Sequence, residues 1–83
     1  MINRTIVLNT LIKHETLTAT DVEKEENLGL VPDGNNLKFL LDELVESGHI
    51  SILGGASKLT YTITNKGISE GIRLNEEEKK NRS

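Results

Sequence analysis

The sequence predicts an α+β fold in which a few helices pack against one small β-hairpin. The first supporting observation is a leucine-rich segment at 35–47, whose apolar residues recur at helical spacing and which ends at Ser47 and Gly48. The second is that residues 50–52 and 59–63 alternate apolar and polar side chains on either side of a glycine-containing loop. With 83 residues the chain is long enough for one domain.

Two helices are expected before this unit. The first covers residues 3–13, where Asn3 can cap the start and one apolar stripe can face inward. That stripe consists of Ile6, Val7, Leu8, Leu11 and Ile12. Residues 15–17 form a short extended link, and a second helix at 19–27 begins after Thr18, whose hydroxyl can cap it. This second helix carries a run of charged side chains and has few apolar residues to bury.

A turn at 28–34 is expected to separate the second helix from the third, because Pro32 cannot lie inside a helix. The third helix covers residues 35–47, with Asp33 or Asn35 as its cap. Its apolar face consists of Leu37, Leu40, Leu41, Leu44 and Val45. The opposite face, which remains in contact with solvent, consists of Asn35, Lys38, Phe39, Asp42, Glu43 and Glu46.

The hairpin is expected to have two strands and to bury one face. The side chains predicted to point inward are Ile50, Ile52, Leu59, Tyr61 and Ile63, and those predicted to point outward are Ser51, Thr60 and Thr62. The connection at 53–59 is too long for a two-residue turn and forms a flexible wing. Thr64 then caps a last helix, which docks on the domain through Ile68 and Ile72.

Charge and composition narrow the class of protein. The formal net charge is −3, and the excess acid lies in residues 1–33, which carry three basic and six acidic side chains, whereas residues 34–73 carry four of each. The second half can therefore hold a locally positive face.

The apolar runs are too short to cross a membrane and no leader pattern opens the chain, so we expect a cytoplasmic protein. The domain is expected at 1–74, followed by a charged, frayed tail at 75–83.

The sequence shows no pattern that is typical of an enzyme, a metal site or a cofactor site. Its two histidines, His14 and His49, have no cysteine and no clustered acidic partners beside them. The serine, histidine and aspartate residues are scattered, without a nucleophile placed next to a base. The glycine pair at 54–55 is not followed by the Gly-Lys-Ser/Thr of a phosphate-binding loop. We therefore expect a non-catalytic protein without metal or cofactor.

Two segments carry a resemblance to a known family. Residues 41–50 (LDELVESGHI) look like the end of a recognition helix that runs into a first wing strand, and residues 61–67 (YTITNKG) look like the second wing strand with the cap of the next helix. At this spacing they resemble winged helix-turn-helix transcriptional regulators of the PadR- and MarR-like groups. The resemblance covers nearly the whole chain. It implies a three-helix bundle with a C-terminal β-hairpin wing and a short final helix.

The same resemblance implies a surface for double-stranded DNA. The third helix would enter the major groove, where Asn can read adenine edges and Lys can reach guanine or phosphate. The implied contact residues are Asn35, Asn36, Lys38 and Phe39 on that helix, Ser57 and Lys58 on the wing, and Thr18 and Thr20 at the start of the second helix. The chain departs from the family's pattern in having Glu23 at a position that is usually small and apolar, and carboxylates along the outer face of the third helix.

An alternative reading is a protein-interaction module that does not bind DNA. This module would use the Phe39 face or the edge of a wing strand, and the acid on the second helix and on the outer face of the third supports it. Asn35 and Asn36 would then only follow a turn and cap a helix, and Lys38 and Lys58 would be surface charges. Phe39 distinguishes the two readings, because an exposed aromatic residue favours a protein partner, whereas the loop at 28–34 could instead cover it. One domain offers few cations to DNA, so we also expect a homodimer or a partner chain. The Phe39 face is the surface through which such a partner would bind.

Overall fold

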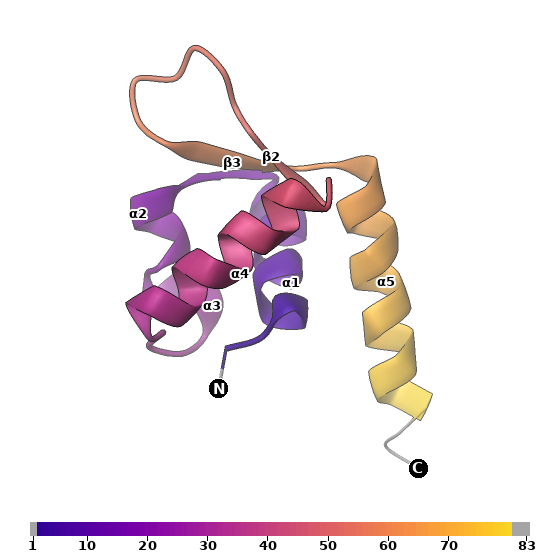
Figure 1. Ribbon diagram of the computed structural model, residues 1–83. Coiled ribbons are helices and arrows are strands. Elements are labelled where there is room, and N and C mark those ends of the chain that lie inside the picture. The colour runs from indigo at the N-terminus through magenta and orange to yellow at the C-terminus, as the bar shows by residue number, and fades with distance from the viewer. Residues whose placement is uncertain (1, 81–83) are drawn as a thin grey trace.

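The computed structural model describes residues 2–80 and contains five helices and one three-stranded sheet in that range (Figure 1). In chain order the elements are α1 (Arg4–His14), β1 (Thr16–Thr18), α2 (Ala19–Val22), α3 (Glu25–Leu28), α4 (Gly34–Glu46), β2 (Ile50–Ile52), β3 (Thr60–Ile63) and α5 (Asn65–Lys80). The predicted α+β class is confirmed, as is the order of a helix followed by a hairpin. None of the helices in the described range is long and apolar enough to span a membrane.

The sheet has one strand more than the sequence predicts. Its order is β1-β3-β2 with antiparallel pairing throughout, so β3 lies in the middle. The third strand, β1, forms from the predicted extended link, and Thr18 lies opposite Thr60 in the register. A three-residue strand has no period that a sequence pattern can reveal, and only its pairing with β3 makes it a strand.

The extra strand explains the errors in the predicted faces of the hairpin. Thr60 was expected to point outward, but it is buried, because β3 has a neighbouring strand on each side. Ile52 and Leu59 were expected to be inside, but half of each side chain is exposed, at 52% and 50% respectively. These two residues lie at the end of the hairpin nearest the loop and border an open groove. Ile50 and Tyr61 are buried as predicted.

The predicted helix at 19–27 is broken in two. The backbone of Lys24 is extended (φ −68°, ψ 135°), so α2 ends before it and α3 begins after it. Only the flanking residues Val22 and Leu28 are buried, because the charged run between them has no apolar side chain to hold a continuous helix against the core. The amide of Asn27 donates to the Asp21 carbonyl at 2.7 Å and satisfies a backbone acceptor at the break.

The helix ends follow the predicted capping residues. The side-chain oxygens of Asn3, Thr18 and Asp33 each accept a backbone N–H in the first turn of α1, α2 and α4. Gly29 and Gly48 both adopt φ of +82°, the left-handed conformation that glycine reaches without strain. The start and stop signals of these helices can therefore be read from local chemistry alone.

The core forms where α1 and α4 pack on the sheet. Leu8, Leu11 and Leu44 are its largest fully buried side chains. On α4 the predicted apolar face is confirmed, since Leu37, Leu41 and Leu44 are buried while the opposite face is exposed. Packing of this one face leaves the polar side of α4 free to contact other molecules.

Helix α5 docks through glycines and not through the predicted isoleucines. Gly67 and Gly71 are buried against the rest of the fold, whereas Ile72 is 52% exposed and Ile68 is partly buried. A Cβ atom on Gly67 would overlap the His49 carbonyl, and one on Gly71 would overlap the Ile12 side chain. The helix lies this close because neither glycine has a side chain.

The same contact continues into the predicted tail. The amides of Asn9 on α1 and Asn75 on α5 exchange two hydrogen bonds, of 3.1 and 2.9 Å. Helix α5 extends to Lys80, so residues 75–80 of the expected tail are helical, and 81–83 lie outside the described residues. Charged pairs spaced three and four residues apart support the helix, with Arg73 bonded to both Glu70 and Glu77.

One strained residue joins α1 to β1 and provides a test of the fold. Glu15 has φ 68° and ψ −52°, a conformation that costs an L-residue roughly 1–3 kcal/mol. Its N–H donates to Leu11 and its carbonyl accepts from Ile63, and neither bond needs a side chain. Glycine would relieve this strain, but it also gives the unfolded chain more entropy, which opposes the gain. We therefore expect Glu15→Gly to raise the free energy of unfolding by about 0.5–1 kcal/mol. Urea denaturation measures the change.

The control for this prediction is a glycine in a regular helix. Glu43 lies on the exposed face in the middle of α4, so Glu43→Gly should lower stability by about 1 kcal/mol. Equal losses in the two variants would show that Glu15 is not strained.

Candidate nucleic-acid interface

The exposed face of α4 is polar at its start and acidic toward its end. Asn35, Lys38 and Phe39 are exposed in the first half of the helix, and Asn36 is partly buried. The backbone N–H of Asn35 donates to the Asp33 carboxylate at 3.0 Å, which leaves the Asn35 side chain available for other contacts. The exposed residues of the second half are Asp42, Glu43 and Glu46. The first half is therefore the part of α4 that suits a polyanion.

Phe39 is 64% exposed, so the loop at 28–34 does not cover it. Of the two environments considered for this residue, the structure shows the solvent-exposed one. An exposed aromatic residue was expected to favour a protein partner, so this exposure supports the protein-interaction reading.

Three segments that are far apart in the sequence meet beside α4. A groove of about 260 Å³ is lined by Ala19 of α2, by Leu37 and Lys38 of α4, and by Leu59 and Tyr61 from the hairpin. The loop between β2 and β3 projects beyond the sheet above α2, on the side of the molecule away from α5 (Figure 1). The start of α2, the start of α4 and the loop thus border one surface.

Lysines on this surface are close to carboxylates. Lys38 Nζ lies 2.9 Å from Asp42 Oδ2, one turn further along α4, and this hydrogen bond raises the pKa of Lys38. Near the same groove, burial raises the pKa of Tyr61, with a further contribution from the charge of Asp42. Lys38 therefore stays positively charged and Tyr61 stays neutral at neutral pH.

A second ion pair lies at α2. Lys24 Nζ is 3.0 Å from Asp21 Oδ1. The pKa of Asp21 is lowered first by the hydrogen bond from Lys24, and further by Thr18 and by the positive charge of Lys58. The effect of Lys58 on Asp21 is consistent with the position of the wing loop above α2. A carboxylate thus lies between the two basic residues of this corner.

Of the eight sequence-based site residues, all of which lie in the described range, Lys38 is the one that lines the groove. Ala19, which lines the groove as well, lies between Thr18 and Thr20 in the sequence. The Thr18 hydroxyl accepts a hydrogen bond from the Asp21 N–H at 3.1 Å, while Thr20 is exposed. On the loop, Ser57 and Lys58 are both exposed.

Sequence reasoning missed the floor of the groove. Leu37, Leu41 and Tyr61 were correctly expected to face inward, but nothing in their spacing shows that an opening remains above them. The opening exists because Ile52 and Leu59 are not covered by a helix, and this depends on how far α2 and α4 reach across the sheet.

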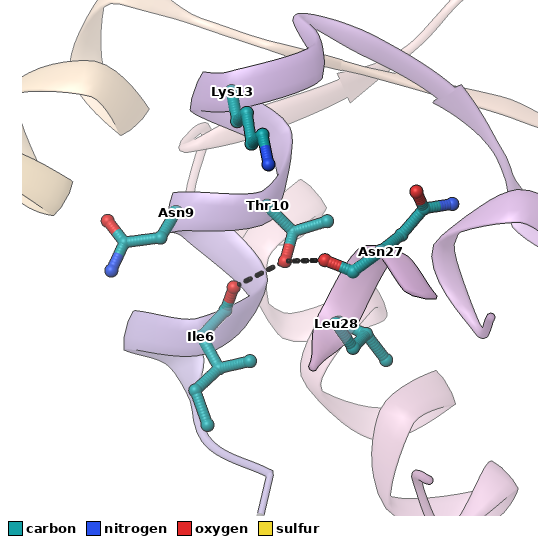
Figure 2. Close-up of a pocket in the computed structure, with 6 residues that line it drawn as sticks. All are labelled: Ile6, Asn9, Thr10, Lys13, Asn27 and Leu28. Atoms are coloured by element: carbon teal, nitrogen blue, oxygen red, sulfur yellow. Dashed lines mark hydrogen bonds between the residues drawn. The ribbon is translucent and has the colours of Figure 1, made fainter. Parts of the chain in front are cut away.

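A second hollow, between α1 and α3, was not expected from the sequence (Figure 2). It measures about 280 Å³, and Ile6, Lys13, Asn27 and Leu28 are among its lining residues. At its base the Thr10 hydroxyl donates to the Ile6 carbonyl at 2.8 Å, and the Asn27 carbonyl lies 3.4 Å from it. These contacts join α3 to α1. Lys13 is the one charged residue among those that line the hollow.

Metal chemistry has no basis in the part of the chain that the structure describes. Within residues 2–80 no three histidine or acidic side chains approach closely enough to hold an ion. His49 is nearly buried, and Ser47 Oγ lies 2.6 Å from its Nδ1. Burial lowers the pKa of His49, and the charges of Arg4 and Lys66 lower it further. This histidine therefore belongs to the junction between α4 and β2.

The comparisons with known proteins identify the fold. No protein-family model matches the sequence, and no curated protein matches it significantly. Among solved structures, a transcriptional regulator from Clostridium thermocellum aligns with a TM-score of 0.82, at 22% sequence identity, over 95% of this chain and 82% of that chain. At this identity the likeness concerns the fold. The chain therefore shares its α+β fold with a protein described as a transcriptional regulator.

Proposed function

We propose that this chain is a small winged-helix DNA-binding protein that acts as a transcriptional regulator. In this proposal α4 lies in the major groove and the loop at 53–59 contacts the backbone. One observation carries it: the exposed start of α4, the start of α2 and the projecting loop border a single surface on the side away from α5. The likeness of the fold to a transcriptional regulator supports the same function.

The side chains at the start of α4 have suitable chemistry for base edges. Asn35 and Asn36 carry amides that can pair with adenine, and Lys38 can donate to guanine or to a phosphate. Phe39 can contact a thymine methyl group or pack against a sugar. The acidic second half of α4 would repel phosphates, so only the first half of the helix enters the groove in this proposal.

The flanking elements would hold the phosphate backbone. Thr20 is exposed at the start of α2, and Thr18 has a hydroxyl proton that it can donate while its oxygen caps the helix. Ser57 and Lys58 are exposed on the loop. These contacts position the protein and carry no sequence information themselves. Since they include few cations, one copy would bind weakly, and we propose that two copies bind together.

Charge reversal at the interface tests the proposal. We expect the double variant Lys38→Glu with Lys58→Glu to lose at least roughly tenfold in affinity for duplex DNA at low salt, because two phosphate contacts become repulsive. The duplex is first selected from a random pool with the wild-type protein, and affinity is then measured by fluorescence anisotropy at two salt concentrations.

The control is a second double variant with the same net charge, in which two lysines outside the proposed interface are replaced. Lys13 lies at the end of α1 and Lys79 near the end of α5, so Lys13→Glu with Lys79→Glu changes the charge equally without altering the proposed interface. Equal losses in the two double variants would contradict the assignment of the surface. A wild-type protein that selects no duplex at low salt would contradict DNA binding itself.

A second candidate function is favoured by the exposure of Phe39. At 64% exposure this side chain is a strong candidate for the centre of a protein interface, where aromatic residues are enriched. In this alternative the domain binds a protein partner, which can be a second copy, and does not bind DNA. Sedimentation of wild type and Phe39→Ser tests self-association: a dimer that Phe39→Ser converts to monomer supports this use of the face.

A further inference from the structure

Two lysines near the proposed DNA surface are held in ion pairs within the chain. Lys38 pairs with Asp42 at 2.9 Å and Lys24 pairs with Asp21 at 3.0 Å. Lys58 has no such pair among the described residues, and its charge makes a small contribution to lowering the pKa of Asp21. Two of the three lysines, Lys38 and Lys24, are therefore opposed by a carboxylate three or four residues away.

We propose that Asp42 competes with DNA phosphate for Lys38 and thereby limits the affinity of this surface, with Asp21 acting in the same way on Lys24. This inference rests on the proposed function, since it concerns how the same surface binds DNA. Lys38 can meet a phosphate through an N–H that Asp42 does not use, or by breaking its bond to Asp42. In either case the Asp42 carboxylate shares or opposes the charge of the lysine and stays one helical turn away, where it repels the phosphate.

The Lys38–Asp42 pair contributes little to the stability of α4. Its side chains are 77% and 60% exposed, and ion pairs in water of this kind are weak. Its orientation is also the less favourable one, because the lysine precedes the acid along the helix, contrary to the order that the helix dipole prefers. Because the pair contributes little to folding, a ligand can break it at low cost. Its main effect is therefore to reduce the positive charge that Lys38 presents to a ligand.

The pair at α2 differs in one respect. Asp21 lies in the first turn of its helix, where the dipole favours an acid, and its N–H is capped by Thr18. Removing its charge would alter the helix as well as the lysine. Asp42 is therefore the residue at which competition for DNA can be measured separately from folding.

The experiment compares Asp42→Asn with Glu46→Gln. Both variants remove one negative charge from the exposed face of α4, but Glu46 has no ion pair among the described residues. We expect Asp42→Asn to tighten DNA binding roughly three- to tenfold at 50 mM salt, from the loss of the ion pair and of one nearby repulsion. Glu46→Gln should give less than half of this gain. Because Lys38 is then free to bind a phosphate, the slope of log Kd against the logarithm of the salt concentration should also become steeper by up to about one.

A double variant shows whether the gain acts through the lysine. With Lys38→Ala already present, adding Asp42→Asn should recover only the smaller, general gain given by Glu46→Gln. Thermal unfolding by circular dichroism checks that every variant is folded, and the midpoint of Asp42→Asn should stay close to that of the wild type.

The outcomes separate this inference from the proposed function. If the wild type binds DNA and Asp42→Asn gains no more than Glu46→Gln, the competition is refuted while DNA binding stands. If Asp42→Asn binds and the wild type does not, the competition is supported, while the proposed function of the wild-type chain fails. If no variant binds at 50 mM salt, the proposed function fails and this inference fails with it.

Discussion

Replacing Gly67 with alanine is expected to lower the free energy of unfolding by roughly 3 kcal/mol or more, the upper range for overpacking of a close contact. The new Cβ would overlap the His49 carbonyl and the Ile63 side chain. The carbonyl cannot move aside easily, because it accepts from the Thr64 N–H at 3.3 Å and from the Thr64 hydroxyl at 2.8 Å. Equilibrium denaturation in urea measures the loss.

Two other glycines serve as matched controls for this prediction. A Cβ on Gly71 also meets a close neighbour, but that neighbour is the end of the Ile12 side chain, which can rotate away. The gain of about 1 kcal/mol in helix propensity would offset part of the cost, so Gly71→Ala should be much milder. Gly54 faces open space and its substitution should be neutral. A Gly67→Ala protein that unfolds with the wild-type midpoint would disprove the close approach of α5.

Replacing Thr64 with valine is expected to cost about 2 kcal/mol, because one hydroxyl serves three elements. Its oxygen accepts from the Gly67 N–H at 3.1 Å and so caps α5. The same oxygen lies 2.7 and 2.8 Å from the Gly48 and His49 carbonyl oxygens, so its proton can donate to either. Valine keeps the shape of the side chain and removes these contacts, so the Gly67 N–H at the start of α5 loses its acceptor and the Gly48 carbonyl loses its donor.

The matched control retains the hydroxyl and removes the methyl group. Thr64→Ser should recover most of the stability that Thr64→Val loses, since serine is an equally good cap. Amide hydrogen exchange adds a local measurement: the first turn of α5 should exchange faster in Thr64→Val, because its end is no longer tied to the hairpin. Equal stability of the valine and serine variants would show that the hydroxyl bonds contribute nothing.

Both predictions concern the junction where α4, β2 and α5 meet, and this junction supports the proposed interface. Gly48 and His49 turn the chain from α4 into β2, and Lys66 of α5 donates to the Ser47 carbonyl at 2.6 Å. The direction of α4 relative to the hairpin is therefore set at the end of α4 that is far from the residues proposed to contact DNA. A loosened junction is expected to weaken DNA binding as well as stability.

Local chemistry in the sequence was sufficient for α1, α4 and the presence of a hairpin, although not for which hairpin residues are buried. The caps of α1 and α4 depend on residues within one or two turns, and the apolar stripe of α4 has a strong period, so the predicted buried leucines proved correct. The candidate DNA-contacting residues came from the resemblance to winged helix-turn-helix regulators, and the period of α4 predicts only that Asn35, Lys38 and Phe39 are exposed. Whether they bind DNA stays a prediction.

Pairing and docking between distant segments could not be read in the same way. The strand β1 exists only through β3, and the helix at 19–27 breaks because its middle has nothing to pack against. The docking face of α5 was predicted wrongly for a physical reason: Ile72 follows the pattern of a buried residue, but Gly67 and Gly71 allow a closer approach on a different side of the helix.

The sequence by itself determined the class of the fold, the limits of α4 and the polarity of its exposed face, since each depends on neighbours within a few residues. Only the tertiary structure decided that the starts of α2 and α4 and Leu59 of the loop at 53–59 line one groove, and that α5 docks through Gly67 and Gly71. These segments are distant in the sequence and meet through space, so no local pattern contains the distances between them.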